Sequence, residues 1–80
     1  MPANTEALVR YLVTSLVDDQ ESVKVTVSET EDSITFEVAL NPDEVGKVIG
    51  RQGRIIKAIR TLARAAGTAG AKQVEVEVAG

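Results

Sequence analysis

The chain has 80 residues, no cysteine, no histidine and a formal net charge of −3. This length predicts one small domain, and the missing residue types exclude a disulfide framework, a thiolate metal site and the usual general base. The longest apolar runs are too short to cross a bilayer and the first residues lack signal-peptide features, so we expect a cytoplasmic protein without membrane contact, metal or cofactor.

The first half of the chain predicts one helix and a hairpin. Asn4 or Thr5 is expected to cap a helix whose apolar residues repeat every three to four positions as far as Val17. Valines at 23, 25 and 27 then alternate with polar residues, as do the apolar residues from Ile34 to Leu40. Such alternation is typical of half-buried strands, and the polar segment 29–32 between them predicts a turn.

The second half predicts two helices and a last strand. Asn41 is expected to cap a short helix that has Pro42 at its first position. A longer helix should run from about Arg54 to Ala66 and be closed by Gly67, with a loop over residues 67–70. Valines at 74, 76 and 78 indicate the final strand. The predicted order is helix, strand, strand, helix, helix, strand, in a single α+β domain over residues 1–80.

A Gly-x-x-Gly step, Gly50-Arg51-Gln52-Gly53, lies between the two later helices. Glycine lets the backbone turn sharply and come close to another molecule. The helix that follows offers unpaired N–H groups and a partial positive charge, which together suit a phosphate group. Taken alone, the pattern also fits a helix–turn–helix corner in which glycine only makes the turn.

The charges of the chain are segregated along the sequence. Residues 1–44 contain ten acidic and two basic residues, whereas residues 45–74 contain seven basic residues and no acidic one. On a helix starting at Arg54, helical periodicity places Arg54, Lys57, Arg60 and Arg64 on one side and the apolar residues on the other. A solvated face would ordinarily mix glutamate with lysine, so an all-basic stripe leading from a glycine loop favours a track for phosphates.

The run Val48-Ile49-Gly50-Arg51-Gln52-Gly53-Arg54-Ile55-Ile56-Lys57 closely resembles the GXXG core of KH domains, which clamp single-stranded nucleic acid in that loop. The element order resembles that of type II (prokaryotic) KH domains, in which three helices pack on a three-stranded mixed sheet. Over essentially its whole length the chain is similar to the KhpA (YlqC-like) family of small bacterial RNA-binding proteins with a single KH domain.

This resemblance implies a role for particular residues. The loop and its neighbours would bind RNA: Lys47, Ile49, Gly50, Arg51, Gln52, Gly53, Arg54 and Lys57. An apolar wall against which bases lie would be formed or backed by Val45, Val48, Ile49 and Ile56, although core packing is an equal alternative for Val48 and Ile56. Arg60 and Arg64 would continue the basic stripe. Phe36 alternates with Ile34 and Val38 and is expected in the core, whereas Tyr11 is expected on the surface or at an interface.

The leading functional hypothesis is binding of single-stranded RNA, with single-stranded DNA as a variant. The resemblance further implies a post-transcriptional regulator or RNA chaperone that forms a homodimer, or a heterodimer with a second KH protein of the Jag/KhpB type. The alternative is a protein-interaction or dimerisation module that uses a KH scaffold with weak or secondary nucleic-acid binding. An enzyme is not expected, because the chain has no phosphate-binding P-loop and no Gly-x-Gly-x-x-Gly motif.

Overall fold

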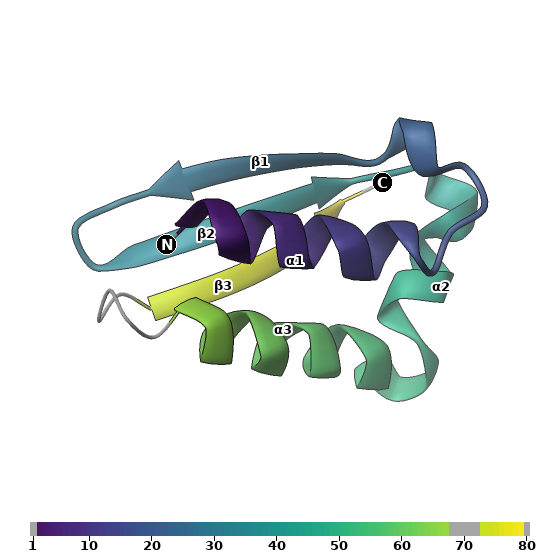
Figure 1. Ribbon diagram of the computed structural model, residues 1–80. Helices are drawn as coiled ribbons and strands as arrows, with labels where there is room; N and C mark the ends of the chain where they lie inside the picture. The colour runs from purple at the N-terminus through teal and green to yellow at the C-terminus, as the bar shows by residue number, and fades with distance from the viewer. Residues whose placement is uncertain (1, 68–72, 80) are drawn as a thin grey trace.

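The structure, a computed structural model, describes residues 2–67 and 73–79. Strands β1 (Lys24–Glu29) and β2 (Ser33–Ala39) form an antiparallel hairpin, and β3 (Gln73–Ala79) pairs with the other edge of β2 in parallel. Helices α1 (Pro2–Thr14), α2 (Val45–Ile49) and α3 (Arg54–Gly67) form one layer on one face of this sheet (Figure 1). The predicted α+β class, element order and mixed sheet are confirmed.

The parallel pairing follows from the connection between β2 and β3. A tight turn can join only antiparallel neighbours, so a chain that returns parallel to β2 must cross the sheet through an intervening segment. Helices α2 and α3 supply that crossover and leave the glycine loop between them at one end of the sheet (Figure 1). The fold therefore exposes this loop at the end of the helical layer.

The predicted bounds of the first helix are wrong at both ends. Helix α1 begins at Pro2, so Asn4 and Thr5 lie inside it and do not cap it. It ends at Thr14, because the hydroxyl groups of Thr14 and Ser15 donate to the carbonyls of Arg10 and Tyr11 at 2.8 and 2.6 Å. Such local hydroxyl bonds compete with a regular helix. The apolar periodicity continues to Val17 because the turn after the helix still packs on the core.

The core lies between the helical layer and the sheet. Phe36 is fully buried in the middle strand, as predicted, beside Val38 and Val76. From the helices, α1 contributes Val9 and Val13, and α3 contributes Ile56, Ile59 and Ala63. Residues 68–70 of the predicted loop lie outside the described residues, and Gly67 is the last residue of α3. No helix within the described ranges is long and apolar enough to cross a membrane.

Candidate nucleic-acid interface

The segment before the glycine loop is built as the sequence predicts. The Asn41 side chain accepts a hydrogen bond from the Asp43 N–H at 3.0 Å, and Pro42 occupies the first position of the turn. This turn is a 3-10 segment, Pro42–Glu44, that continues directly into α2. The cap satisfies a backbone donor that the helix start leaves unpaired, which fixes the direction in which the chain enters the site.

The loop itself holds three residues with positive φ. Gly50 has φ 76° and ψ 175°, Gln52 has φ 56° and ψ 24°, and Gly53 has φ 72°. Glycine adopts such angles without a steric penalty, whereas Gln52 is a side-chain-bearing residue in the left-handed region. Backbone strain of this kind is concentrated at active sites and ligand-binding loops, where the surrounding fold holds the backbone in an unfavourable conformation. The conformation turns the chain sharply between α2 and α3.

Hydrogen bonds within the loop decide which amides can meet a ligand. The N–H groups of Gly50, Gly53 and Arg54 donate to the carbonyls of Gly46, Gly50 and Arg51, respectively. Within the described chain, this leaves the N–H groups of Arg51 and Gln52 for an outside acceptor. Both of these amides belong to exposed residues of the loop.

The cations around the loop differ in whether a carboxylate neutralises them. Arg51, Arg54 and Lys57 are exposed, and within the described residues none of them forms an ion pair. The Arg54 guanidinium donates to the Gln52 side-chain oxygen at 3.4 Å, which is a weak internal contact. The loop is thus surrounded by positive charge that remains available to an anion.

Lys47 is the exception. Its Nζ lies 2.8 Å from the Asp18 Oδ2, an exposed pair in which the hydrogen bond and the lysine charge lower the pKa of Asp18. The hydrogen bond that Lys47 donates to Asp18 likewise raises the pKa of Lys47. The pair therefore stabilises the fold above the ordinary Asp pKa of 3.8 and below the ordinary Lys pKa of 10.5; it is lost as pH falls through the lowered value or rises through the raised one. A phosphate would compete with Asp18 for this lysine.

The predicted apolar wall divides into two pairs. Val48 and Ile56 are 0% and 4% exposed, so they belong to the core and do not contact a base. Helical periodicity alone could not separate these alternatives, because both residues flank the loop on apolar faces. Val45 and Ile49 are half-buried on α2, where they pack against the core and retain some surface. Only this second pair can contact a ligand.

The far end of the predicted basic stripe turns away from the loop. The Nε of Arg60 donates to the Val76 carbonyl at 3.2 Å, and the Nε of Arg64 donates to the Val74 carbonyl at 3.3 Å. Both arginines therefore lie along the free edge of β3. The predicted stripe is continuous along α3. Arg54 and Lys57 are exposed near the loop, whereas Arg60 and Arg64 are hydrogen-bonded to carbonyls of β3.

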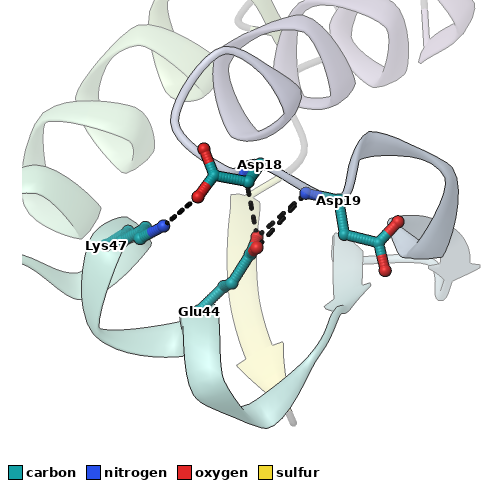
Figure 2. Close-up of polar contacts among 4 residues, drawn as sticks. All are labelled: Asp18, Asp19, Glu44 and Lys47. Atoms are coloured by element: carbon teal, nitrogen blue, oxygen red, sulfur yellow. Dashed lines mark hydrogen bonds and ion pairs between the residues drawn. The ribbon is translucent and has the colours of Figure 1, made fainter.

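Glu44 is a site residue that sequence reasoning missed. It is only 9% exposed, and its carboxylate accepts hydrogen bonds from the backbone N–H groups of Asp18 at 3.1 Å and Asp19 at 3.2 Å (Figure 2). These bonds tie the start of α2 to the turn after α1. The two donor N–H groups lie 26 and 25 positions away in the chain, so no local pattern reveals them.

Removing this carboxylate is expected to destabilise the protein. In Glu44→Ala the two amides lose a charged acceptor in a partly buried turn, which should lower the free energy of unfolding by about 2–3 kcal/mol. Denaturant unfolding followed by circular dichroism measures this loss. Asp43→Ala is the matched control, because Asp43 is exposed in the same turn and should change the unfolding free energy by less than about 0.5 kcal/mol. Equal effects at the two positions would contradict the role of Glu44.

Three acidic residues of the sheet lie side by side on strands β2 and β3. Glu75 and Glu77 are exposed and alternate with the buried Val74 and Val76, so they occupy the face of the sheet opposite the helices. Glu37 lies directly beside Glu77 across the parallel pair. Like charges at this spacing repel a polyanion. The described residues contain no cluster of acidic side chains able to hold a metal ion.

Comparison with known proteins places the chain in a family. The family described as KhpA/KhpB, KH domain, matches residues 6–78. Relatives named RNA-binding protein KhpA include one from Listeria monocytogenes, 42% identical over 91% of this chain and 96% of its own length. Another, from Clostridium perfringens, is 48% identical over 89% and 95% of the two chains, and one from Bacillus subtilis is 41% identical over 91% and 90%.

Solved structures support the same fold. A structure of Era in complex with MgGDPNP and nucleotides 1506–1542 of 16S ribosomal RNA aligns over 94% of this chain with a TM-score of 0.68 and 19% identity. An Aquifex aeolicus Era variant bound to GDP and aluminium fluoride aligns over 92% with a TM-score of 0.67. This chain spans only 30% and 29% of those two chains. At this identity the likeness shows a KH-like fold and nothing about activity.

Proposed function

Because the chain belongs to the KhpA/KhpB family of KH domains, we propose that it binds single-stranded RNA at the Gly50–Gly53 loop. The observation that carries this proposal is the combination at the loop of two outward amides with three cations that no carboxylate of the described residues neutralises. Relatives that span nearly the same length are named RNA-binding proteins. The proposal concerns binding, with no catalytic step.

The mechanism follows from where the groups lie. A phosphate oxygen accepts hydrogen bonds from the Arg51 and Gln52 amides, while the Arg51 and Arg54 guanidinium groups balance its charge. Lys57, one turn along α3, meets the next phosphate. Bases then lie against the remaining surface of Val45 and Ile49, which offers apolar contact without a stacking ring. Affinity should therefore be modest and depend strongly on salt.

Fluorescence polarisation of labelled homopolymers across salt concentrations tests this proposal. On the order of three to five phosphate contacts predict a slope of log affinity against log salt of about −2 to −3.5 for a single strand. Comparing the affinity for a DNA homopolymer of the same length with that for RNA measures the contribution of the 2′-hydroxyl. No binding to any homopolymer, or an affinity that salt leaves unchanged, would contradict a phosphate clamp.

Several finer points belong to the same proposal. Residues 1–80 act as a single KH domain, and the protein works in the cytoplasm as a post-transcriptional regulator or RNA chaperone. Weak binding by one domain suits such a role, because a transient contact releases RNA quickly. Pairing with a second copy, or with a KH protein of the Jag/KhpB type, would raise affinity through avidity.

A dimerisation module is the second candidate, and one surface favours it. Between α1 and α3 lies a shallow apolar hollow of about 410 Å³. Leu62 is 47% exposed and Tyr11 is 68% exposed at this surface. A second copy suits the hollow, because a two-fold pair would place the protruding side chains of each copy into the hollow of the other.

Substitution at Leu62 tests the second candidate. Leu62→Lys should convert a dimer into a monomer in sedimentation velocity across a concentration series, because a charge would be buried at the contact. Thr61→Lys adds the same charge at the adjacent exposed position and should leave the mass unchanged. A monomeric wild-type protein at the highest concentration would remove this candidate.

A further inference from the structure

The two edges of the sheet differ in how their outward backbone groups are covered. Strand β2 lies in the middle, so β1 and β3 are the edge strands. At β3 the outward carbonyls of Val74 and Val76 accept hydrogen bonds from Arg64 and Arg60. Charged side chains laid over an edge keep other strands from pairing with it. The β3 edge is therefore protected by its own helix, and the edge at β1 is the one to compare with it.

The register of the hairpin fixes which groups of β1 point outward. The turn is closed by the Thr30 N–H, which donates to the Ser33 carbonyl at 2.8 Å. Bonded and non-bonded positions alternate in an antiparallel pair, so every second residue before Thr30 bonds to β2. The residues between them include Val25 and Val27, whose N–H and C=O groups point to the open edge. Within the described residues no hydrogen bond uses these four groups.

The same two valines leave apolar surface at this edge. Their side chains face the core side of the sheet, because Val25 lies opposite the buried Val38 and Val27 opposite the buried Phe36. Val27 is nevertheless 36% exposed, and Val25 is half-buried. A strand added here would cover both side chains while it paired their backbone groups. Hydrogen bonds and apolar contact are thus offered by the same residues.

The charge around β1 is acidic. Residues 18–37 contain seven acidic residues and a single basic one, Lys24. Glu21 is exposed just before β1, and Glu31 and Asp32 are exposed in the turn just after it. A field of this sign attracts a cationic chain and repels a nucleic acid. The surroundings of the edge therefore suit a basic polypeptide and not RNA.

A second copy of this chain fits the edge less well. In an antiparallel pair of two β1 strands centred on Val27, the turn that carries Glu31 would lie beside the start of the other strand, near Glu21. Like charges placed across a strand pair destabilise it. A basic segment avoids this repulsion and gains from the same carboxylates.

We propose that the β1 edge binds an extended segment of a basic partner protein, which pairs antiparallel with residues 25–27 as a fourth strand. Alternate residues of such a segment point to opposite faces. Apolar residues would pack beside the two valines, and lysine or arginine residues between them would face the acidic surroundings. The inference goes beyond the proposed function, because β1 lies at the other edge of the sheet from α3 and the glycine loop follows α2 (Figure 1). RNA and the partner segment can therefore be bound together.

A model peptide tests strand addition on the full chain. The probe is a labelled octapeptide of alternating lysine and valine, titrated by fluorescence polarisation without RNA. N-methylation at the valines removes the donors that face β1 and should weaken binding by about 30-fold, the effect of two lost hydrogen bonds. N-methylation at the lysines leaves those donors in place and should weaken it by less than about threefold. No binding, or equal effects of the two sets, would overturn strand addition.

Amide hydrogen exchange followed by NMR shows where the peptide pairs. The amides of Val25 and Val27 should exchange rapidly in the free protein and at least about tenfold more slowly with saturating peptide. The amides of Thr26 and Ser28 are bonded to β2 and should change little. Protection of the two valine amides that rises with protein concentration in the absence of peptide would assign the edge to a second copy and overturn the basic partner.

Variants assign the binding to this edge. Val27→Pro removes one outward donor, and proline is tolerated on an edge strand where the N–H faces solvent, so peptide affinity should fall by about tenfold while RNA affinity is unchanged. Glu21→Lys with Glu31→Lys should lower peptide affinity by about tenfold and allow a glutamate–valine octapeptide to bind. Glu75→Lys with Glu77→Lys makes the same change in charge at the other edge and should alter it by no more than about threefold.

The outcomes separate this inference from the proposed function. Unchanged peptide affinity in both edge variants would overturn the site, whatever the RNA result. If circular dichroism shows that Val27→Pro does not fold, the charge variants and the N-methylated peptides decide the question. Loss of RNA binding by loop variants with peptide binding retained would leave the β1 edge standing, because the two ligands are measured independently.

Discussion

Replacing both Arg51 and Gln52 with aspartate is expected to lower the affinity for single-stranded RNA by about 100-fold or more. The change removes one positive charge and places two negative charges beside the phosphate-binding amides. Each unit charge a few ångströms from a phosphate is worth at least about 1 kcal/mol even in water, and three such changes multiply to this loss. Both side chains are exposed, so folding should persist.

The control for this experiment carries the same change in charge at another place. Lys24→Asp combined with Gln20→Asp alters two exposed positions near the start of β1, away from the loop. It should lower RNA affinity by no more than about threefold through the long-range field. Polarisation assays on both variants, with circular dichroism to check folding, provide the measurement. Unchanged affinity in the loop variant would rule out the loop as the clamp.

The second large effect is expected at Gly50. A Cβ there would lie 2.6 Å from the Ile55 Cγ1 and 2.9 Å from its Cβ, and the backbone has φ 76°. The Ile55 Cβ is anchored in the first turn of α3 and cannot move aside as a flexible side-chain end could. Gly50→Ala should therefore lower the free energy of unfolding by about 2–4 kcal/mol, from strain and overpacking together. Thermal unfolding should shift down by roughly 10–20 °C.

Gly53 offers a matched comparison within the same loop. Its φ of 72° is nearly the same, but an added Cβ would lie 3.8 Å from the Ile56 Cγ2, an ordinary contact distance. Gly53→Ala should cost only the backbone penalty of about 1–2 kcal/mol. Equal destabilisation at the two positions would show that the clash with Ile55 does not contribute. The two glycines of the motif thus have different physical reasons for lacking a side chain.

Local patterns were sufficient to predict most of the fold. Alternating apolar residues predicted the three strands, and the Asn41-Pro42 cap predicted the start of the turn before α2, because each depends on neighbours within a few residues. The first helix was the failure: its apolar repeat extends to Val17, but the helix ends at Thr14. Periodicity reports which residues are buried, and a packed turn can continue it beyond the last helical hydrogen bond.

The candidate site was predicted in part. The exposed Arg51, Gln52, Arg54 and Lys57 lie around the loop as expected, but Val48 and Ile56 belong to the core. The half-buried Val45 and Ile49 and the buried Val48 and Ile56 are all aliphatic. Their local pattern fits a groove wall and a core equally well. Only the packing of α2 and α3 against the sheet distinguishes an apolar residue that faces a ligand from one that belongs to the core.

Taken alone, the amino-acid sequence determined the order of the elements, the glycine turn and the separation of acidic from basic residues, since these depend on side-chain type and short spacing. The tertiary structure alone decided three things: that Glu44 accepts from the turn after α1, that Asp18 pairs with Lys47, and that Arg60 and Arg64 bond to β3. Their partners lie between 10 and 29 positions away in the chain. Such contacts form only when packing brings distant segments together, and no local periodicity encodes them.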